Sequence, residues 1–235
     1  MLVGANMKIK LAFITLFLLC AGLLSAGDIA RFVNLGFSDD NRFFMFAQYG
    51  VQETTSFPYA DVFVVDVPVN KFVPQGVKHG VFSEPSEPGY NGEGALFNLL
   101  EDNLPLKKRY RIRHLNTGRL LYLLIDGNES KSKLDFRDFV RGKQYRVRLI
   151  QSPRGSGKNI KSSFFIELNI IARDGTMRDY TIGLPNYERK GVKSYKIKQI
   201  LLAPDGRSMI FVVEKEETDG TGSNFRYMIE TVRIN

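Results

Sequence analysis

The sequence predicts a mainly β protein, built as an antiparallel meander with one short helix. Runs of β-branched and aromatic residues recur along the chain, turn residues separate most of them, and only one segment has helical spacing. The runs that we expect to form strands are residues 43–49, 61–67, 145–150, 164–172, 195–202, 209–213 and 226–234.

Turns with Asp, Asn and Gly punctuate these runs. Asp174-Gly175 lies between the apolar runs 166–172 and 177–182, and an Asp-Gly pair in that setting is typical of a β-hairpin. Further turns are expected at residues 39–41, 126–128 and 205–206.

The expected helix covers residues 95–100, where apolar side chains recur at helical spacing between Glu93 and Glu101. A segment rich in Pro, Gly, Ser and Glu, residues 82–94, precedes it. Such a segment serves as a lid or as a linker, and the sequence leaves both readings open.

The first 26 residues have the three parts of a cleavable secretory signal peptide. Lys8 and Lys10 form the charged start, residues 11–24 the apolar middle, and Ala26 the small exit residue. The apolar stretch is about 14 residues, whereas a membrane anchor needs about 20. We therefore predict export, cleavage after residue 26, a single mainly β domain over residues 27–235, and no transmembrane segment after cleavage. Met7 is an alternative start.

Cys20 is the only cysteine of the chain. A lipid-anchored protein is the alternative that it raises, but the apolar run continues past it, so we read it as part of the signal peptide. Cleavage after residue 26 leaves a chain without disulfides or thiolate metal sites.

Two segments of the chain match each other at an offset of 165 positions. Residues 37–42 fall on residues 202–207, so that Asp40 coincides with Asp205 and Arg42 with Arg207. In each segment an apolar strand, an Asp-centred turn, an arginine and another apolar strand follow in order. We expect Asp40, Arg42, Asp205 and Arg207 to have structural roles in these turns.

This repeated pattern resembles one blade of the TolB-like β-propellers. Ser38, Asp40, Arg42, Phe46 and residues 64–66 carry the resemblance in the first segment, and residues 205–207 with Phe211 in the second. The resemblance implies propeller-blade-like hairpins at both ends of the exported chain. A β meander with such hairpins is favoured over a small five-bladed β-propeller, because the intervening repeats are not visible.

The order of features also resembles a bacterial family of predicted secreted, periplasmic proteins without an assigned function. Residues 27–30, 36–40, 49–52 and 58–67 carry this second resemblance, together with residues 226–228 near the carboxyl terminus. It implies a secreted or periplasmic location and supplies no active site.

Positive charge is concentrated in the middle of the chain. Residues 101–161 hold 16 Lys and Arg against 6 Asp and Glu, whereas residues 27–100 hold 4 against 9. Arginine alternates with apolar residues there, which in a strand would place the arginines on one face. The candidate binding residues are Arg109, Arg111, Arg113, Arg146 and Arg148. An anionic envelope surface or another envelope protein is the expected partner, and a solvated sheet exterior is the alternative.

Other chemistries have weaker support in the sequence. His79 and His114 are isolated from each other, so we expect no metal site and no cofactor. Residues 155–158 depart from a phosphate-binding loop and are expected to be a hairpin turn. We expect no nucleic-acid partner, because no recognised binding motif is present.

We therefore predict an exported binding protein of the cell envelope that acts without catalysis. An envelope glycan hydrolase is the first alternative; it needs two carboxylates at a suitable separation, and Asp40, Asp61, Asp66 and Asp205 are available. A structural periplasmic scaffold, expected to have neither cleft nor basic patch, is the second.

Overall fold

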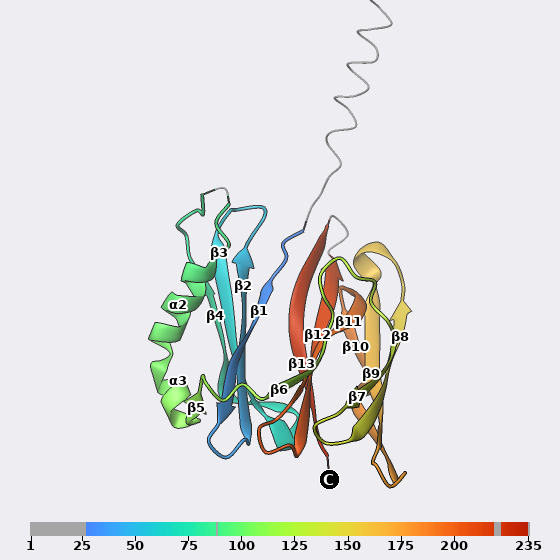
Figure 1. Cartoon of the computed structure of the whole chain (residues 1–235). Coiled ribbons are helices and arrows are strands. Elements are labelled where there is room, and N and C mark those ends of the chain that lie inside the picture. The colour runs from blue at the N-terminus through green and yellow to red at the C-terminus, as the bar shows by residue number, and fades with distance from the viewer. Residues whose placement is uncertain (1–26, 88, 219–221, 235) are drawn as a thin grey trace, which may run out of the picture.

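The computed structural model describes residues 27–87, 89–218 and 222–234, so the predicted signal peptide lies outside the described residues. Strands dominate, as predicted, and they form three antiparallel sheets (Figure 1). The helix-side sheet has the order β4-β3-β2-β1-β5, the central sheet β13-β12-β11-β6 and the outer sheet β10-β9-β8-β7. The five-bladed propeller is therefore not formed by the described residues.

The three sheets contain strands from separate parts of the chain. The helix-side sheet comprises β1 (Arg31–Ser38), β2 (Phe43–Val51), β3 (Pro58–Asp66), β4 (Lys71–Val81) and β5 (Ile112–Arg113). The central sheet comprises β6 (Arg119–Leu123), β11 (Val192–Leu202), β12 (Ser208–Thr218) and β13 (Ser223–Arg233). The outer sheet comprises β7 (Lys133–Asp138), β8 (Lys143–Arg154), β9 (Lys161–Ile171) and β10 (Met177–Lys190).

The helices are short. The predicted helix is confirmed as α2 (Glu93–Asp102), and a second helix, α3 (Leu104–Arg109), follows it directly. Single 3-10 turns, η1 (Val67–Val69) and η2 (Gly157–Asn159), follow β3 and β8. No helix among the described residues has the length and apolar character to cross a membrane.

The layers stack in the order helices, helix-side sheet, central sheet and outer sheet (Figure 1). Each interface between layers holds its own cluster of buried apolar residues, and the central sheet contributes to two of them. On β12, Met209, Phe211 and Val213 face the outer sheet, whereas Ile210 and Val212 face the helix-side sheet. The unbroken apolar run 209–213 is thus the signature of a strand buried on both faces.

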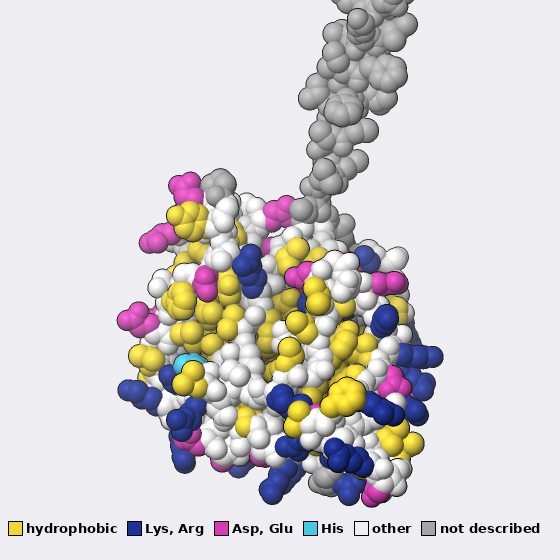
Figure 2. Space-filling view, in the orientation of Figure 1, with side chains coloured by type: hydrophobic (Ala, Val, Ile, Leu, Met, Phe, Trp, Pro, Cys, Tyr) yellow, Lys and Arg dark blue, Asp and Glu magenta, His cyan; other side chains and the backbone are white. Residues whose placement is uncertain are grey.

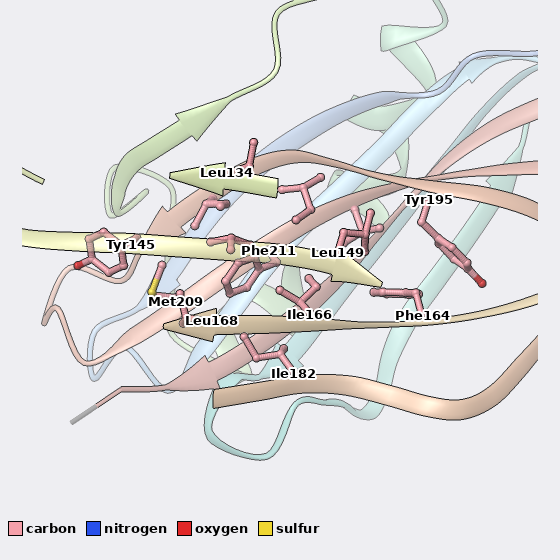
Figure 3. Packing of buried hydrophobic residues seen from close by; sticks show 14 of the residues in the cluster. Leu134, Tyr145, Leu149, Phe164, Ile166, Leu168, Ile182, Tyr195, Met209 and Phe211 are labelled. Carbon is pink, nitrogen blue, oxygen red and sulfur yellow. The ribbon is translucent and has the colours of Figure 1, made fainter. Parts of the chain in front are cut away.

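Figure 3 shows the cluster between the central and outer sheets. Phe211 and Tyr195 pack there against Leu149, Phe164 and Ile166. The rings of Phe164 and Tyr195 have centroids 4.4 Å apart. Because all these side chains are almost fully buried, this cluster is a major source of the stability that holds the outer sheet in place.

Two regions differ from the sequence-based expectations. β4 was not expected, because Pro74 and Gly76 interrupt it; it tolerates them as an edge strand with a register shift opposite residues 63–65. The alternation of arginine and apolar residues from Arg109 to Arg113 would place the arginines on one face in a strand, but most of this segment is not a strand. Arg109 ends α3, and Arg111 has a left-handed backbone with φ of 51°, so only Ile112 and Arg113 pair as a strand.

The segment at the start of the described chain is held against the central sheet. Ile29 forms a parallel bridge with Phe225 of β13, and the amide of Ala30 donates to the Phe225 carbonyl at 3.0 Å. A side chain at Gly27 would collide with the carbonyl oxygen of Ser223, since a Cβ atom there would lie 1.6 Å from it. Glycine is thus the residue that allows this close approach.

Candidate functional site

The structure divides the five candidate arginines into two groups. Arg111 and Arg113 both contact Asp39, at 3.5 and 3.3 Å, at the end of the helix-side sheet, and Arg109 lies nearby at the end of α3. Arg146 and Arg148 lie on β8 of the outer sheet, on the far side of the molecule (Figure 1). The central sheet separates the two groups, so the five arginines do not share one face.

Each group also has acidic partners. Arg146 pairs with Asp135 and Arg148 with Glu167, both at 3.4 Å. Figure 2 shows Lys and Arg side chains mainly over the lower and right-hand parts of one face, with acidic side chains among them. Exposed pairs of this kind contribute little to stability, about 0–1 kcal/mol each, and they offset much of the positive charge.

Asp40 and Asp205 each accept the amide of the arginine two residues further on, Arg42 or Arg207. The Asp40 carboxylate accepts hydrogen bonds from the Ser38 hydroxyl at 2.6 Å and from the backbone amide of Arg42 at 3.1 Å. The hydrogen bond from Ser38 holds the pKa of Asp40 below its usual value. Asp205 accepts the amide of Arg207 at 2.9 Å in the corresponding turn.

A groove with exposed aromatic side chains crosses the edges of all three sheets. We call it the three-edge groove, because its lining includes the edge strands β4, β13 and β10. Its volume is about 710 Å³, within the range of about 300–1,000 Å³ that is typical of ligand sites. Most of its residues were not singled out from the sequence.

Apolar side chains are exposed on two walls of the three-edge groove. Phe72 of β4 is 50% exposed, and its ring lies 5.5 Å from that of the buried Phe63. On the opposite sheet, Leu184 and Tyr187 of β10 are 61% and 56% exposed. The strand pairing of β10 with β9 skips residues 185–188, so a bulge in β10 displays Tyr187.

Side chains from β2 and from the turn before β4 cap the edge of β13 that faces the groove. The amide of Tyr227 donates to the side-chain oxygen of Gln48 at 2.7 Å, and the amide of Thr231 donates to that of Asn70 at 2.8 Å. Gln48 in turn donates to Asp61 at 2.8 Å. These bonds satisfy edge amides that a bare edge strand leaves open.

Most charged groups of the groove have a partner of opposite charge. Asp61 contacts His79 at 2.7 Å, and Arg226 contacts the buried Asp28 at 2.7 Å while stacking on Tyr59. Lys215 pairs with Glu217. The groove is therefore polar without carrying a large net charge.

Glu230 is the most deeply placed acid of the groove, with 5% exposure. Its carboxylate accepts a hydrogen bond of 2.5 Å from the side-chain nitrogen of Asn70 and lies 3.7 Å from the Arg189 guanidinium. Burial raises the pKa of Glu230, although Asn70 and Arg189 both oppose that shift. The Arg189 guanidinium lies over the rings of Phe164 and Tyr187, 5.1 and 4.9 Å from their centroids.

Only one of the four candidate aspartates reaches the groove. Asp61 lines it, whereas Asp66 pairs with Arg42 at 2.8 Å, and Asp40 and Asp205 lie in turns. The histidines are also separate, since His114 contacts the carbonyl of Leu35. Across the described residues no group of three or more His, Cys, Asp or Glu side chains is arranged to hold a metal ion.

The fold and the groove define a protein of stacked β-sheets with a mixed polar and apolar groove across their edges. Residues 45–233 match the model of the family described as "Predicted secreted protein (DUF2259)", and the chain belongs to that family. The match includes every residue that lines the groove. The expected secreted location agrees with this family description, which names no activity. No curated protein matches the chain.

Proposed function

We propose that this exported protein is a non-catalytic binding protein of the cell envelope and that the three-edge groove holds its ligand. The observation that carries the proposal is the exposure of Phe72, Leu184 and Tyr187 around a polar groove of about 710 Å³. Large apolar side chains exposed beside convergent polar groups are typical of binding sites.

The groove supports the proposal better than the candidate arginines do. Arg111 and Arg113 lie two sheets away from Arg146 and Arg148, and all four have acidic neighbours. A partner would have to contact opposite layers of the molecule to use all four. An anionic envelope surface bound by these arginines therefore becomes the second candidate.

A glycan hydrolase with a pair of aspartates has less support than binding. Such enzymes place two carboxyl groups about 5–10 Å apart across the bond to be cleaved. Asp61 lines the groove, but His79 and Gln48 already engage both of its oxygens. A purely structural scaffold does not account for the exposed apolar side chains that line the groove.

Retention on sedimented envelope material from the exporting cells tests the proposal. We expect the double variant L184A/Y187A to lose retention at least about fivefold, because the exposed anchors of a groove carry much of the binding energy. The matched comparison is R111Q/R113Q/R146Q/R148Q, which we expect to be retained like the wild type.

The opposite result, retention of the groove variant and release of the arginine variant, would favour binding by the basic residues. Thermal unfolding of each variant serves as the control for folding. All six substituted side chains are largely exposed, so both variants should unfold within a few degrees of the wild type.

A further inference from the structure

We infer that the ligand of the three-edge groove is an uncharged saccharide chain. This inference rests on the proposed function of the groove and adds the chemical class of the ligand. Three features of the groove support it: aromatic side chains on two walls, paired polar groups between them, and a capped strand edge.

The aromatic side chains suit the C–H faces of sugar rings. Phe72 presents a half-exposed ring from the helix-side sheet, and Tyr187 presents one from the outer sheet. The Tyr187 ring is held by the Arg189 guanidinium at 4.9 Å, which limits the freedom that the ring would lose on binding. A flat aromatic ring can pack against the C–H groups on one face of a sugar ring. The hydroxyl groups at the edge of the sugar ring then stay free for hydrogen bonds.

The polar groups between these walls suit hydroxyl and amide groups of a ligand. A hydroxyl group donates one hydrogen bond and accepts others, so it is best matched by donors and acceptors lying side by side. Asp61 with the exposed His79, and Lys215 with Glu217, offer that arrangement. The side chains are already oriented by each other, which lowers the entropy lost when a ligand binds.

The charges of the groove argue against a strongly anionic ligand. Its cations are Lys71, Arg189, Lys215 and Arg226. Its acids are Asp61, Glu217 and Glu230, and Asp28 adds a fourth carboxylate through its contact with Arg226. The lining residues alone have a formal charge of +1, and the charge is balanced when Asp28 is included, so a polyanion would gain little from entering.

The capped edge of β13 argues against an extended peptide. Peptides that join a sheet edge gain affinity from main-chain hydrogen bonds with that edge. Here the amides of Tyr227 and Thr231 already donate to Gln48 and Asn70, at 2.7 and 2.8 Å. A peptide strand that joined β13 would have to break both bonds, so at this edge recognition falls to side chains, which suits a ligand rich in hydroxyl groups.

The test is a calorimetric titration of the purified exported protein with tetramers of N-acetylglucosamine, glucose and mannose. Each titration is carried out at low and at high salt. We expect at least one tetramer to bind, with an affinity that changes less than about twofold between about 50 and 500 mM salt, since no net charge is neutralised. Tyr187→Ala and Phe72→Ala should each weaken it about tenfold. The matched control Phe139→Ala, an aromatic side chain 83% exposed outside the groove, should bind like the wild type.

The outcomes separate the ligand class from the proposed function. If envelope retention depends on Leu184 and Tyr187 but no tetramer binds, the saccharide inference is wrong and the binding function stands. Binding that disappears at high salt, or that responds equally to Phe139→Ala, also overturns it. If retention itself does not depend on the groove, the proposed function fails together with the inference.

Discussion

The turn that joins β1 to β2 and the turn that joins β11 to β12 have the same local geometry in two different sheets. In the first, the amide of Asn41 donates to the Ser38 carbonyl at 3.0 Å; in the second, Gly206 donates to the Ala203 carbonyl at 2.8 Å. Asn41 and Gly206 are both left-handed, with φ of 59° and 67°. An aspartate, Asp40 or Asp205, then accepts the amide two residues further on.

The surroundings of the two turns differ. The first turn is braced by side chains: the Ser38 hydroxyl bonds Asp40 and accepts the Phe43 amide, and Arg42 reaches Asp66 on β3. The second turn has Ala203 in place of that serine, and Arg141, in the connection between β7 and β8, donates to the Gly206 carbonyl at 3.1 Å. The same short sequence pattern therefore builds the turn, while the braces around it differ: Ser38 and Asp66 for the first turn and Arg141 for the second.

The strands that follow the two turns allow the largest test of this comparison. Phe46 on β2 and Phe211 on β12 are fully buried in different clusters, on the two sides of the central sheet. We expect Phe46→Ala and Phe211→Ala each to lower the free energy of unfolding by about 3–5 kcal/mol, because both leave a cavity in a packed core. Urea denaturation measures both.

A loss below about 1 kcal/mol for either variant would show that its sheet contributes little to the cooperative core. Phe139→Ala is the matched control, because that ring is exposed and should change the free energy by less than about 0.5 kcal/mol.

The aspartates of the two turns give a smaller difference. Asp40→Ala removes bonds to the Ser38 hydroxyl and to the Arg42 amide, and we expect a loss of about 1–2 kcal/mol. Asp205→Ala removes the bond to the Arg207 amide, and we expect about 0.5–1 kcal/mol. In a Ser38→Ala background the cost of Asp40→Ala should fall to that of Asp205→Ala, which a double-mutant cycle measures. An unchanged cost would show that the serine does not account for the difference.

The pH dependence of stability distinguishes the first turn from the groove. The pKa values of Asp40 and Glu230 shift in opposite directions, so the two acids change the stability with pH in opposite directions. The pKa of Asp40 is lowered from 3.8, so its contribution to stability is present above that value and is lost as the pH falls through the folded pKa. The pKa of Glu230 is raised from 4.5, so its contribution is present below that value and is lost as the pH rises through the folded pKa.

Thermal unfolding across the acid range measures both effects. Asp40→Asn should flatten the loss of stability at low pH, and Glu230→Gln should flatten the loss that begins above about pH 4.5. A Glu230→Gln profile parallel to that of the wild type would contradict the raised pKa of that buried acid.

The sequence indicates the two turns because their chemistry is local: an aspartate, a left-handed residue and an arginine follow one another. The groove has no such signal. Asn70 and Glu230 are 160 positions apart in the chain and are hydrogen-bonded in the groove. Tyr187 and Arg189 line the groove at a bulge in β10. No periodic pattern encodes contacts between the edges of three sheets, so the groove requires the tertiary structure.

The arginine-rich segment shows the limit of periodicity in another way. Alternating arginine and apolar residues from Arg109 to Arg113 fit a strand face, but the same residues end a helix and turn at Arg111. The pattern was too short to distinguish the two. The runs 195–202 and 209–213, in contrast, are longer or continuously apolar and are bounded by turns, and both are confirmed as strands.

The arginines of the two turns give the smallest expected effect. Arg42 contacts Asp66 at 2.8 Å through a largely exposed side chain, whereas Arg207 forms no ion pair with another described residue. We expect Arg42→Gln to lower the free energy of unfolding by up to about 1 kcal/mol at low salt and Arg207→Gln to leave it nearly unchanged. The difference should shrink when the salt concentration rises tenfold, because the Arg42 pair is exposed to solvent. Urea denaturation of both variants at the two salt concentrations measures this difference. Equal losses in the free energy of unfolding would contradict a role for the contact with Asp66. They would mean that the contribution of each arginine comes from its position after the aspartate.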